Sequence, residues 1–190
     1  MTDGSNSGPD VPELGAERVR LRRLTVADAP GLHEAYADAA SMRFWDALPS
    51  RDIAETEARI RQSTSADATW YAAWAVLAKR DDAFIGMVNY HARQVWNRRL
   101  AVGWIQTPRF EGQGYMTEAM QALLRHCFDG LHTHRVEAEI EPDNLRSQRL
   151  AERLGFRREA LLRDRLCVAG EPRSIWMYAL LQPEWNAPCP

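Results

Sequence analysis

The stretch that decides the fold is Arg109-Phe110-Glu111-Gly112-Gln113-Gly114-Tyr115-Met116-Thr117, between a strand-like run and a strongly periodic helical segment. Glycine lets the backbone approach a ligand closely and adopt conformations that other residues avoid. The first turn of the helix that follows leaves its N–H groups unpaired and carries the positive end of the helix dipole. These features together predict a binding site for a phosphate or pyrophosphate group.

This pattern alone is a weak signal, because a tight turn before a helix explains Gly-x-Gly equally well. Two familiar nucleotide motifs do not fit it. The P-loop needs Gly-Lys-Ser/Thr, which is missing here. The dinucleotide fingerprint needs a third glycine and an early position in a βαβ unit, and both are missing. The ligand class therefore has to be decided from the residues on either side.

Periodic segments flank this stretch on both sides. Apolar residues alternate from residue 18 onward and predict a first strand, and helical spacing follows from about residues 28 and 50. Further strands are predicted at residues 70–78, 84–91, 100–106, 135–140, 161–168 and 175–181, and further helices at 115–128 and 145–154. This order predicts an α/β sandwich with a mixed sheet.

Length and composition favour one globular domain. The chain has 190 residues, 45% of them hydrophobic and 26% charged. Its net charge of −2 and pI near 6.2 give no support to binding of nucleic acid or anionic membrane. Residues 1–14 are rich in Gly, Ser, Pro and Asp and are predicted to be a disordered tail. We therefore expect a single domain over residues 15–190.

Other whole-chain signals point to a cytoplasmic protein. No apolar run approaches the roughly 18–20 residues of a membrane helix, and the polar start of the chain lacks a signal-peptide pattern. The three cysteines are too few and too scattered for a disulfide framework or a metal site: Cys127, Cys167 and Cys189. We expect reduced thiols and no bound metal.

Two blocks of sequence resemble the GNAT superfamily of N-acetyltransferases. The first is Arg109, Gly112 and Gly114 followed by Tyr115-Met116-Thr117-Glu118-Ala119. The second, about thirty residues on, is Glu141-Pro142-Asp143-Asn144-Leu145-Arg146-Ser147 with Leu154-Gly155-Phe156. The residues of both blocks are similar to those of the RimJ/RimL branch of the family, which acetylates N-termini of ribosomal proteins. The resemblance implies a mixed, mostly antiparallel sheet flanked by helices, in which the fourth and fifth strands splay apart, and acetyl-coenzyme A as the cofactor.

The resemblance also implies cofactor-binding residues. The pantetheine arm pairs with the backbone of the fourth strand, which points to Trp104, Ile105, Gln106 and Thr107. The pyrophosphate reaches the amides of residues 112–117, next to Arg109. Asn144 resembles the residue that hydrogen-bonds the pantetheine chain, and it also suits the N-cap of its helix. Arg149 and Arg153, with Arg146, fall near the adenosine 3′-phosphate, although a charged helix face is often merely solvated.

The catalytic groups are only partly suggested by the sequence. Many family members place a tyrosine beside the leaving thiolate, but the matching position here is Ala151. Ser147 is the predicted replacement, because helical spacing puts it toward the apolar stripe. The alternative is a serine that satisfies the first-turn amides. A strand glutamate of several members is also missing, so the base stays open among Glu137, Glu139 and His91. An ordered water as the base, or an amine that arrives already neutral, is an equally good alternative.

The acceptor side is the least defined. Phe44 and Trp45 fall in the loop that, by resemblance, covers the acceptor, although core packing explains them equally well. Acidic residues nearby favour a cationic amine: Asp38, Asp46, Asp52 and Glu55. The leading expectation is acetyl transfer to a primary amine, a protein N-terminus above others. The alternatives are an antibiotic or polyamine acetyltransferase, a non-catalytic acyl-CoA-binding module and a structural protein with a degenerate site. A homodimer remains open.

Overall fold

The computed structural model describes residues 11–65 and 67–185. Its strands, in chain order, are β1 (Leu14–Gly15), β2 (Val19–Arg23), β3 (Ala72–Ala78), β4 (Phe84–Gln94), β5 (Arg99–Gln106), β6 (Arg135–Ile140), β7 (Arg157–Val168) and β8 (Glu171–Leu181). Its helices are α1 (Ala29–Tyr36), α2 (Ala39–Met42), α3 (Ile53–Thr64), α4 (Tyr115–Arg125), α5 (Leu145–Arg153) and α6 (Gln182–Trp185). Short turns of helix are η1 (Val26–Asp28), η2 (Pro108–Phe110) and η3 (His126–Gly130), the last a π-helical continuation of α4.

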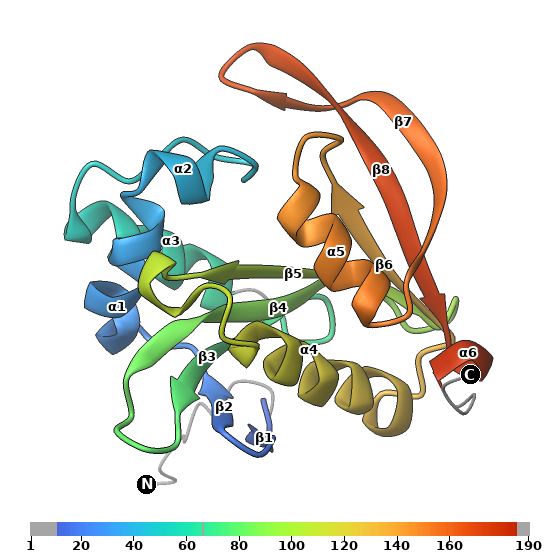
Figure 1. The fold of residues 1–190 in the computed structure, drawn as a ribbon, viewed down its shortest axis with the longest axis horizontal. Helices are drawn as coiled ribbons and strands as arrows, with labels where there is room; N and C mark the ends of the chain where they lie inside the picture. The colour runs from blue at the N-terminus through green and yellow to red at the C-terminus, as the bar shows by residue number, and fades with distance from the viewer. Residues whose placement is uncertain (1–10, 66, 186–190) are drawn as a thin grey trace, which may run out of the picture.

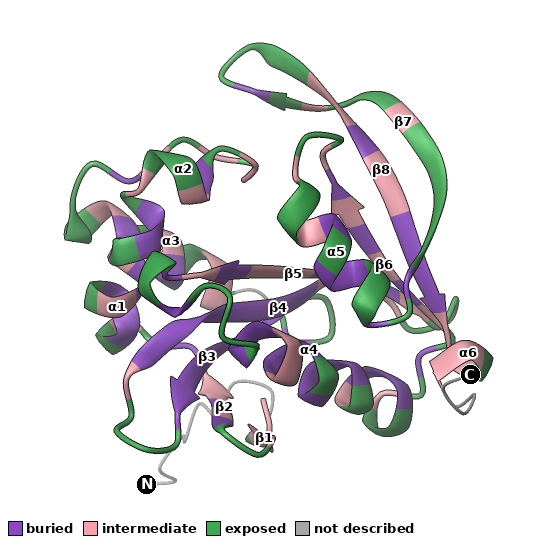
Figure 2. Ribbon diagram, viewed as in Figure 1, coloured by how far each residue is buried: buried purple, intermediate pink, exposed green. Residues whose placement is uncertain are grey.

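The eight strands form one sheet in the order β1-β2-β3-β4-β5-β6-β8-β7, antiparallel except between β5 and β6. Helices cover it on both faces, with α4 and α5 on one side and α1 and α3 on the other (Figure 1). All seven residues of β3 are buried because this strand lies between both helical layers (Figure 2). The predicted α/β fold with a mixed, mostly antiparallel sheet is confirmed.

The helices begin where their capping residues predict. Asp52 accepts a hydrogen bond from the amide of Glu55 at the start of α3, and Asn144 accepts one from Ser147 at the start of α5. In α4 the inward positions recur at three and four residues, and all are buried: Met116, Ala119, Met120, Leu123 and Leu124. This stripe packs α4 against the centre of the sheet.

The sheet divides between β5 and β6. These two strands pair only at Arg99 with Arg135, Leu100 with Val136 and Ala101 with Glu137. Beyond Ala101, β5 continues beside β4, whereas β6 stays beside β8 over its whole length. Because β1 adds a strand at the start, these are the fourth and fifth strands of the prediction. Their predicted splaying is confirmed.

The predicted tail is wrong at its inner end. Residues 1–10 lie outside the described residues, but Leu14–Gly15 forms β1 and pairs with β2. Just before it, the Pro12 carbonyl accepts a hydrogen bond of 2.8 Å from the indole of Trp74. Polar composition suggested disorder, but pairing with an existing strand and a buried indole, sixty residues away, orders this segment.

The last two strands form a hairpin longer than predicted. The alternation of apolar residues predicted strands at 161–168 and 175–181, and both begin about four residues earlier, at Arg157 and Glu171. Most of β7 is exposed, so its start carries little hydrophobic signal, and pairing with β8 defines it instead. The hairpin extends past the end of β6 (Figure 1). In the described part of the chain, no helix is both long and apolar enough to cross a membrane.

Candidate active site

The glycine stretch forms a loop that leads into α4. Gly112 and Gly114 have φ angles of 73° and 82°, in the left-handed region, and Gly114 is the N-cap of α4. Only glycine adopts this region without strain, so both positions depend on it. Within the described chain, the amides of residues 112–117 donate to no protein acceptor. Consecutive free amides at a helix N-terminus are a site for an anion.

Arg18, at the start of β2, supports this loop, and sequence reasoning missed it. Its backbone amide donates to Glu118 at 2.9 Å and its Nε pairs with the same carboxylate. Its Nη1 donates to the Gln113 carbonyl at 3.1 Å, and its guanidinium lies over the Tyr115 ring at 4.7 Å. Glu118 would otherwise place an unmatched negative charge in the first turn of α4. No sequence pattern marks Arg18, because it looks like any outward residue of an alternating strand.

The second block, α5, lies beside the same loop. Arg146 forms an ion pair with Glu111, and Arg153 Nη1 lies 3.5 Å from Thr117 Oγ1. Arg149 is exposed. Both arginines border the free amides, but Glu111 already matches the charge of Arg146, so Arg153 is the one that adds positive charge where an anion would lie. The two sequence blocks, thirty residues apart in the chain, meet at one site.

The edge of β5 presents only some of the predicted backbone groups. The amide and hydroxyl of Thr107 both donate to the Ile85 carbonyl of the β3–β4 side, at 2.9 Å. Backbone groups of a strand alternate in direction, so Ile105 also faces β4, whereas Trp104 and Gln106 face the gap. The backbone groups of Ile105 and Thr107 therefore point toward β4 and away from the gap, whereas those of Val102, which was not predicted, face the gap by the same alternation. The role of this edge in holding the pantetheine arm stays a prediction.

The Arg109 side chain contacts helix α1 and the Phe110 ring. Its guanidinium forms an ion pair with Glu34 of α1 at 3.1 Å and lies 4.9 Å from the centre of the Phe110 ring. Its charge is thus already matched by a carboxylate. Its carbonyl accepts a hydrogen bond from the Gln113 side chain at 3.0 Å. The structure supports Arg109 as a residue that shapes the loop rather than as a direct phosphate ligand.

Asn144 and Ser147 lie at the start of α5, at the gap. Asn144 Oδ1 accepts from the Ser147 amide at 3.2 Å, so its N-cap role is confirmed. Ser147 is half-buried next to the buried residues Gln148 and Ala151. Its hydroxyl makes no hydrogen bond to any described residue, which leaves it free for a ligand. Whether it serves the thiolate stays a prediction.

The loop after α2 lies near the gap, on the face of the sheet that α1 and α3 cover. Phe44 is half-buried, with the Arg43 guanidinium 4.9 Å from its ring centre, and Trp45 packs against Tyr36 at 6.1 Å. Arg173 of β8 donates to the Arg43 carbonyl at 2.8 Å and to Glu141 at 3.0 Å. This loop therefore contacts the hairpin across the top of the gap. Trp45 is partly buried and packs against the core between the sheet and helices α1 and α3, so its predicted alternative role in packing is confirmed.

Polar side chains gather on this same face. His91 and Asn89 of β4 are hydrogen-bonded, with 3.0 Å between His91 Nδ1 and Asn89 Oδ1. Burial lowers the pKa of His91 from its ordinary value, although Glu139 and Asp46 act in the opposite direction. Of the acidic candidates, Glu137 is held by Arg99 at 3.1 Å and by Arg135 at 2.7 Å.

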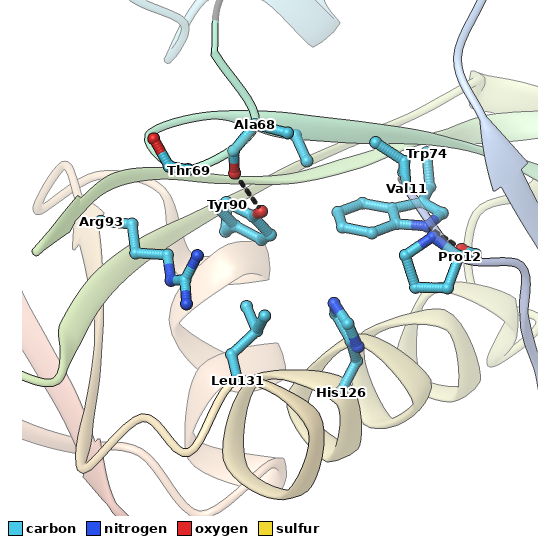
Figure 3. A pocket seen from close by; sticks show the side chains of 10 residues that line it. Val11, Pro12, Ala68, Thr69, Trp74, Tyr90, Arg93, His126 and Leu131 are labelled. Carbon is cyan, nitrogen blue, oxygen red and sulfur yellow. Dashed lines mark hydrogen bonds between the residues drawn. The ribbon is translucent and has the colours of Figure 1, made fainter. Parts of the chain in front are cut away.

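A separate cavity of about 150 Å³ lies elsewhere (Figure 3). Trp74 and Tyr90 line it from the sheet, His126 and Leu131 line it from the end of α4, and Arg93 closes one side. The free amides lie at the opposite end of α4. The cavity therefore contributes no residue to the site between the loop and the gap.

Comparison with known proteins agrees with this geometry. Residues 18–157 match the family described as the acetyltransferase (GNAT) domain. The chain belongs to the GNAT acetyltransferases. It is an acetyltransferase, its cofactor is acetyl-CoA, and the free amides, the arginines of α5 and the unpaired edge of β5 suit that molecule's phosphates and its amide-bearing arm.

Three known proteins illustrate what this GNAT chain is similar to. The N-acetyltransferase p20 of Bacillus licheniformis is 28% identical over 173 residues, which cover 90% of this chain and 97% of p20. The ribosomal protein uS5-alanine N-acetyltransferase of Escherichia coli is 36% identical over 85 residues, 45% of this chain and 44% of that enzyme. A GCN5-related N-acetyltransferase structure from Brucella melitensis has a TM-score of 0.84 at 26% identity, covering 94% of this chain and 82% of its own.

Proposed function

We propose that this GNAT enzyme transfers the acetyl group of acetyl-CoA to the N-terminal amine of a protein. The observation that carries acetyl transfer is the row of unpaired amides at residues 112–117, next to a sheet opened between β5 and β6. The choice of a protein acceptor is supported by the Escherichia coli relative, which acts on an alanine of a ribosomal protein.

Different groups around the gap bind the cofactor and assist the departure of the thiolate. Acetyl-CoA, when bound, supplies the activated acetyl group as a thioester. The loop amides, with Arg153, hold its phosphates, and the backbones of Val102, Trp104 and Gln106 hold its arm. The Ser147 hydroxyl donates a hydrogen bond to the departing sulfur, a contact that strengthens as charge develops there.

The acceptor face suits an amine that arrives as an ammonium. Asp46 lies in the loop after α2, and Glu139 points from β6 toward the same region as His91. Arg165 neutralises Glu139 only in part, at 3.2 Å and with a quarter of the Glu139 side chain exposed. Carboxylates around the entrance attract the cation and raise its local concentration.

The test is a thiol-release assay with several amines in parallel. Peptides that begin with alanine or serine, a polyamine and an aminoglycoside serve as acceptors, and the same peptides with a blocked N-terminus serve as controls. We expect turnover only with the free peptides. Turnover with the polyamine or the aminoglycoside alone would point to a small-molecule acetyltransferase, and CoA binding without any turnover would point to a non-catalytic acyl-CoA-binding module.

A further inference from the structure

His91 lies where the two halves of the sheet part. On β4 it pairs directly with Ala101 of β5, and Ala101 is the last β5 residue that pairs with β6. Neighbouring strands are about 5 Å apart, so His91 lies one strand away from the closed end of the gap. From Gln106 near the loop to Ala101 the edge of β5 spans roughly 17 Å, at about 3.4 Å per residue. A linear arm held by the loop amides reaches His91 along this edge.

The side chain of His91 lies on the acceptor face. Along β4, Met87 packs into the cluster formed with α1 and α3, and residues two apart on a strand share a face. Asn89 and His91 therefore continue that face beyond the helices. The opposite face, which carries Val88 and Tyr90, is filled by α4. A half-buried imidazole on the acceptor side is thus accessible to an amine that enters under the loop after α2.

Asn89 fixes the orientation of the imidazole. Its Oδ1 is an acceptor 3.0 Å from His91 Nδ1, an arrangement that favours the tautomer with the proton on Nδ1 and the free lone pair on Nε2. Asn89 itself is only 5% exposed and lies opposite Gly103. A Cβ at Gly103 would lie 3.1 Å from Asn89 Nδ2, so glycine at this position leaves room for the amide.

The groups around the ring come from every neighbouring element. Tyr71 precedes β3 in the register position opposite His91, Glu137 and Glu139 lie on β6, and Asp46 approaches from the loop after α2. Both Glu137 and Glu139 have oxygens taken up by guanidinium groups, of Arg99, Arg135 and Arg165. Burial keeps the pKa of His91 below its ordinary value. The ring is therefore neutral and able to accept a proton at neutral pH.

We propose that His91 is the general base that takes the proton from the acceptor amine, with Asn89 as its positioning residue. This inference rests on the proposed function. The ammonium first loses one proton to solvent, which frees the nitrogen lone pair. The neutral amine nitrogen then bonds to the thioester carbonyl carbon, its second proton passes to His91 Nε2, and the carbon–sulfur bond breaks with its electron pair on sulfur. The imidazolium returns that proton to the thiolate, directly or through a water molecule, and the neutral ring is restored.

The first test observes the His91 imidazole by NMR and needs no catalytic turnover. Nitrogen-detected NMR of the folded protein reports the tautomer and the pKa of each histidine. We expect the Nδ1-protonated tautomer and a pKa below about 6.5 for His91. Asn89→Ala should mix the tautomers, and Asn89→Asp should raise the pKa by adding a charge. An Nε2-protonated ring in the wild-type protein would overturn the proposal.

The second test is kinetic. His91→Gln and His91→Ala should lower kcat about 100-fold, the low end of general-base catalysis, and should abolish the acidic limb of the pH profile. Their affinity for CoA, measured by calorimetry, should be unchanged. Added imidazole should restore turnover to His91→Ala, which has space for it, and not to His91→Gln. The matched control is His126→Gln, a second histidine whose pKa burial lowers, at the far end of α4.

The two hypotheses fail in different ways. A wild-type protein that acetylates none of the amines contradicts the proposed function, whatever the NMR result. A wild-type protein that turns over, with His91→Gln retaining its rate and its pH profile, contradicts the base assignment alone. Thermal melting of each variant identifies loss through misfolding, and imidazole rescue of a folded His91→Ala protein separates a proton-transfer role from a structural one.

Discussion

The two sides of the gap are built in opposite ways. On the cofactor side, one continuous segment supplies six amides that are free of any acceptor in the described residues, and side chains from the residue before β2 and from α5 only support it. On the acceptor side, His91, Glu139, Phe44 and Arg173 come from four separate segments, and each is held by its own partner. Backbone geometry dominates the first side, and side-chain assembly dominates the second.

This difference affects how each side tolerates change. A backbone site depends on a few φ angles, so glycine substitutions should damage it severely, whereas its supporting side chains should matter less. A side-chain site should lose one property at a time, because each group acts separately. The following substitutions test that contrast, from the largest expected effect to the smallest.

Gly114→Asp should weaken CoA binding by about 100-fold or more. The substitution strains a residue at φ 82° and puts a carboxylate where we propose that the pyrophosphate binds, and losing two charge-assisted hydrogen bonds costs about 3–6 kcal/mol. Calorimetry with CoA measures the change. The control is Gly170→Asp, with φ 86° in the open β7–β8 turn, which carries the same backbone strain and should bind CoA normally. Unchanged binding in a folded Gly114→Asp protein would remove the loop from the site.

Ser147→Ala should lower kcat about 10- to 100-fold, because a neutral hydroxyl contributes at or below the low end of general-acid catalysis. The affinity for CoA should fall much less, since the hydrogen bond strengthens only as charge develops on sulfur. Steady-state kinetics and calorimetry together measure both. Ser65→Ala, at the exposed end of α3, is the control. If Ser147→Ala keeps the wild-type kcat, Ser147 has only a structural role in the first turn of α5.

Phe44→Ala should raise the KM for the amine about tenfold and leave the KM for acetyl-CoA nearly unchanged, because removing a half-buried ring loses about 1–2 kcal/mol of apolar contact. Trp45→Ala should also raise the amine KM, but with a drop in Tm, because the indole packs against Tyr36. Kinetics and thermal melting distinguish the two residues. If only the KM for acetyl-CoA changed, this loop would belong to the cofactor side of the gap and not to the acceptor side.

Arg18→Ala should weaken CoA binding only about 2- to 5-fold, the size of a charge effect near a helix N-terminus. It leaves Glu118 without its partner in the first turn of α4, next to the anion site. Arg18→Ala combined with Glu118→Gln should recover most of the loss, because the unmatched charge is then gone. If the double variant binds as weakly as the single one, Arg18 acts through the Gln113 carbonyl instead.

The sequence by itself determined the local features. Gly112 and Gly114 before an amphipathic segment predicted the anion-binding loop and α4, because turn chemistry and helical periodicity act over a few residues. Asn144 as an N-cap and the alternating strands followed from the same short-range physics. The order of these elements, with two recognisable blocks, predicted the family and the divided sheet, and both are confirmed.

Only the tertiary structure decided which groups meet across long separations. Arg18 reaches Glu118 over 100 residues, and Arg173 reaches the Arg43 carbonyl over 130. The backbone directions of Ile105 and Thr107, and the ordering of Pro12 by Trp74, depend on strand register and on packing. Register is fixed when the whole sheet buries its faces, and no short window of sequence contains that information. The sequence named His91 only as one of several candidate bases, and its place beside Ala101 depends on the same register.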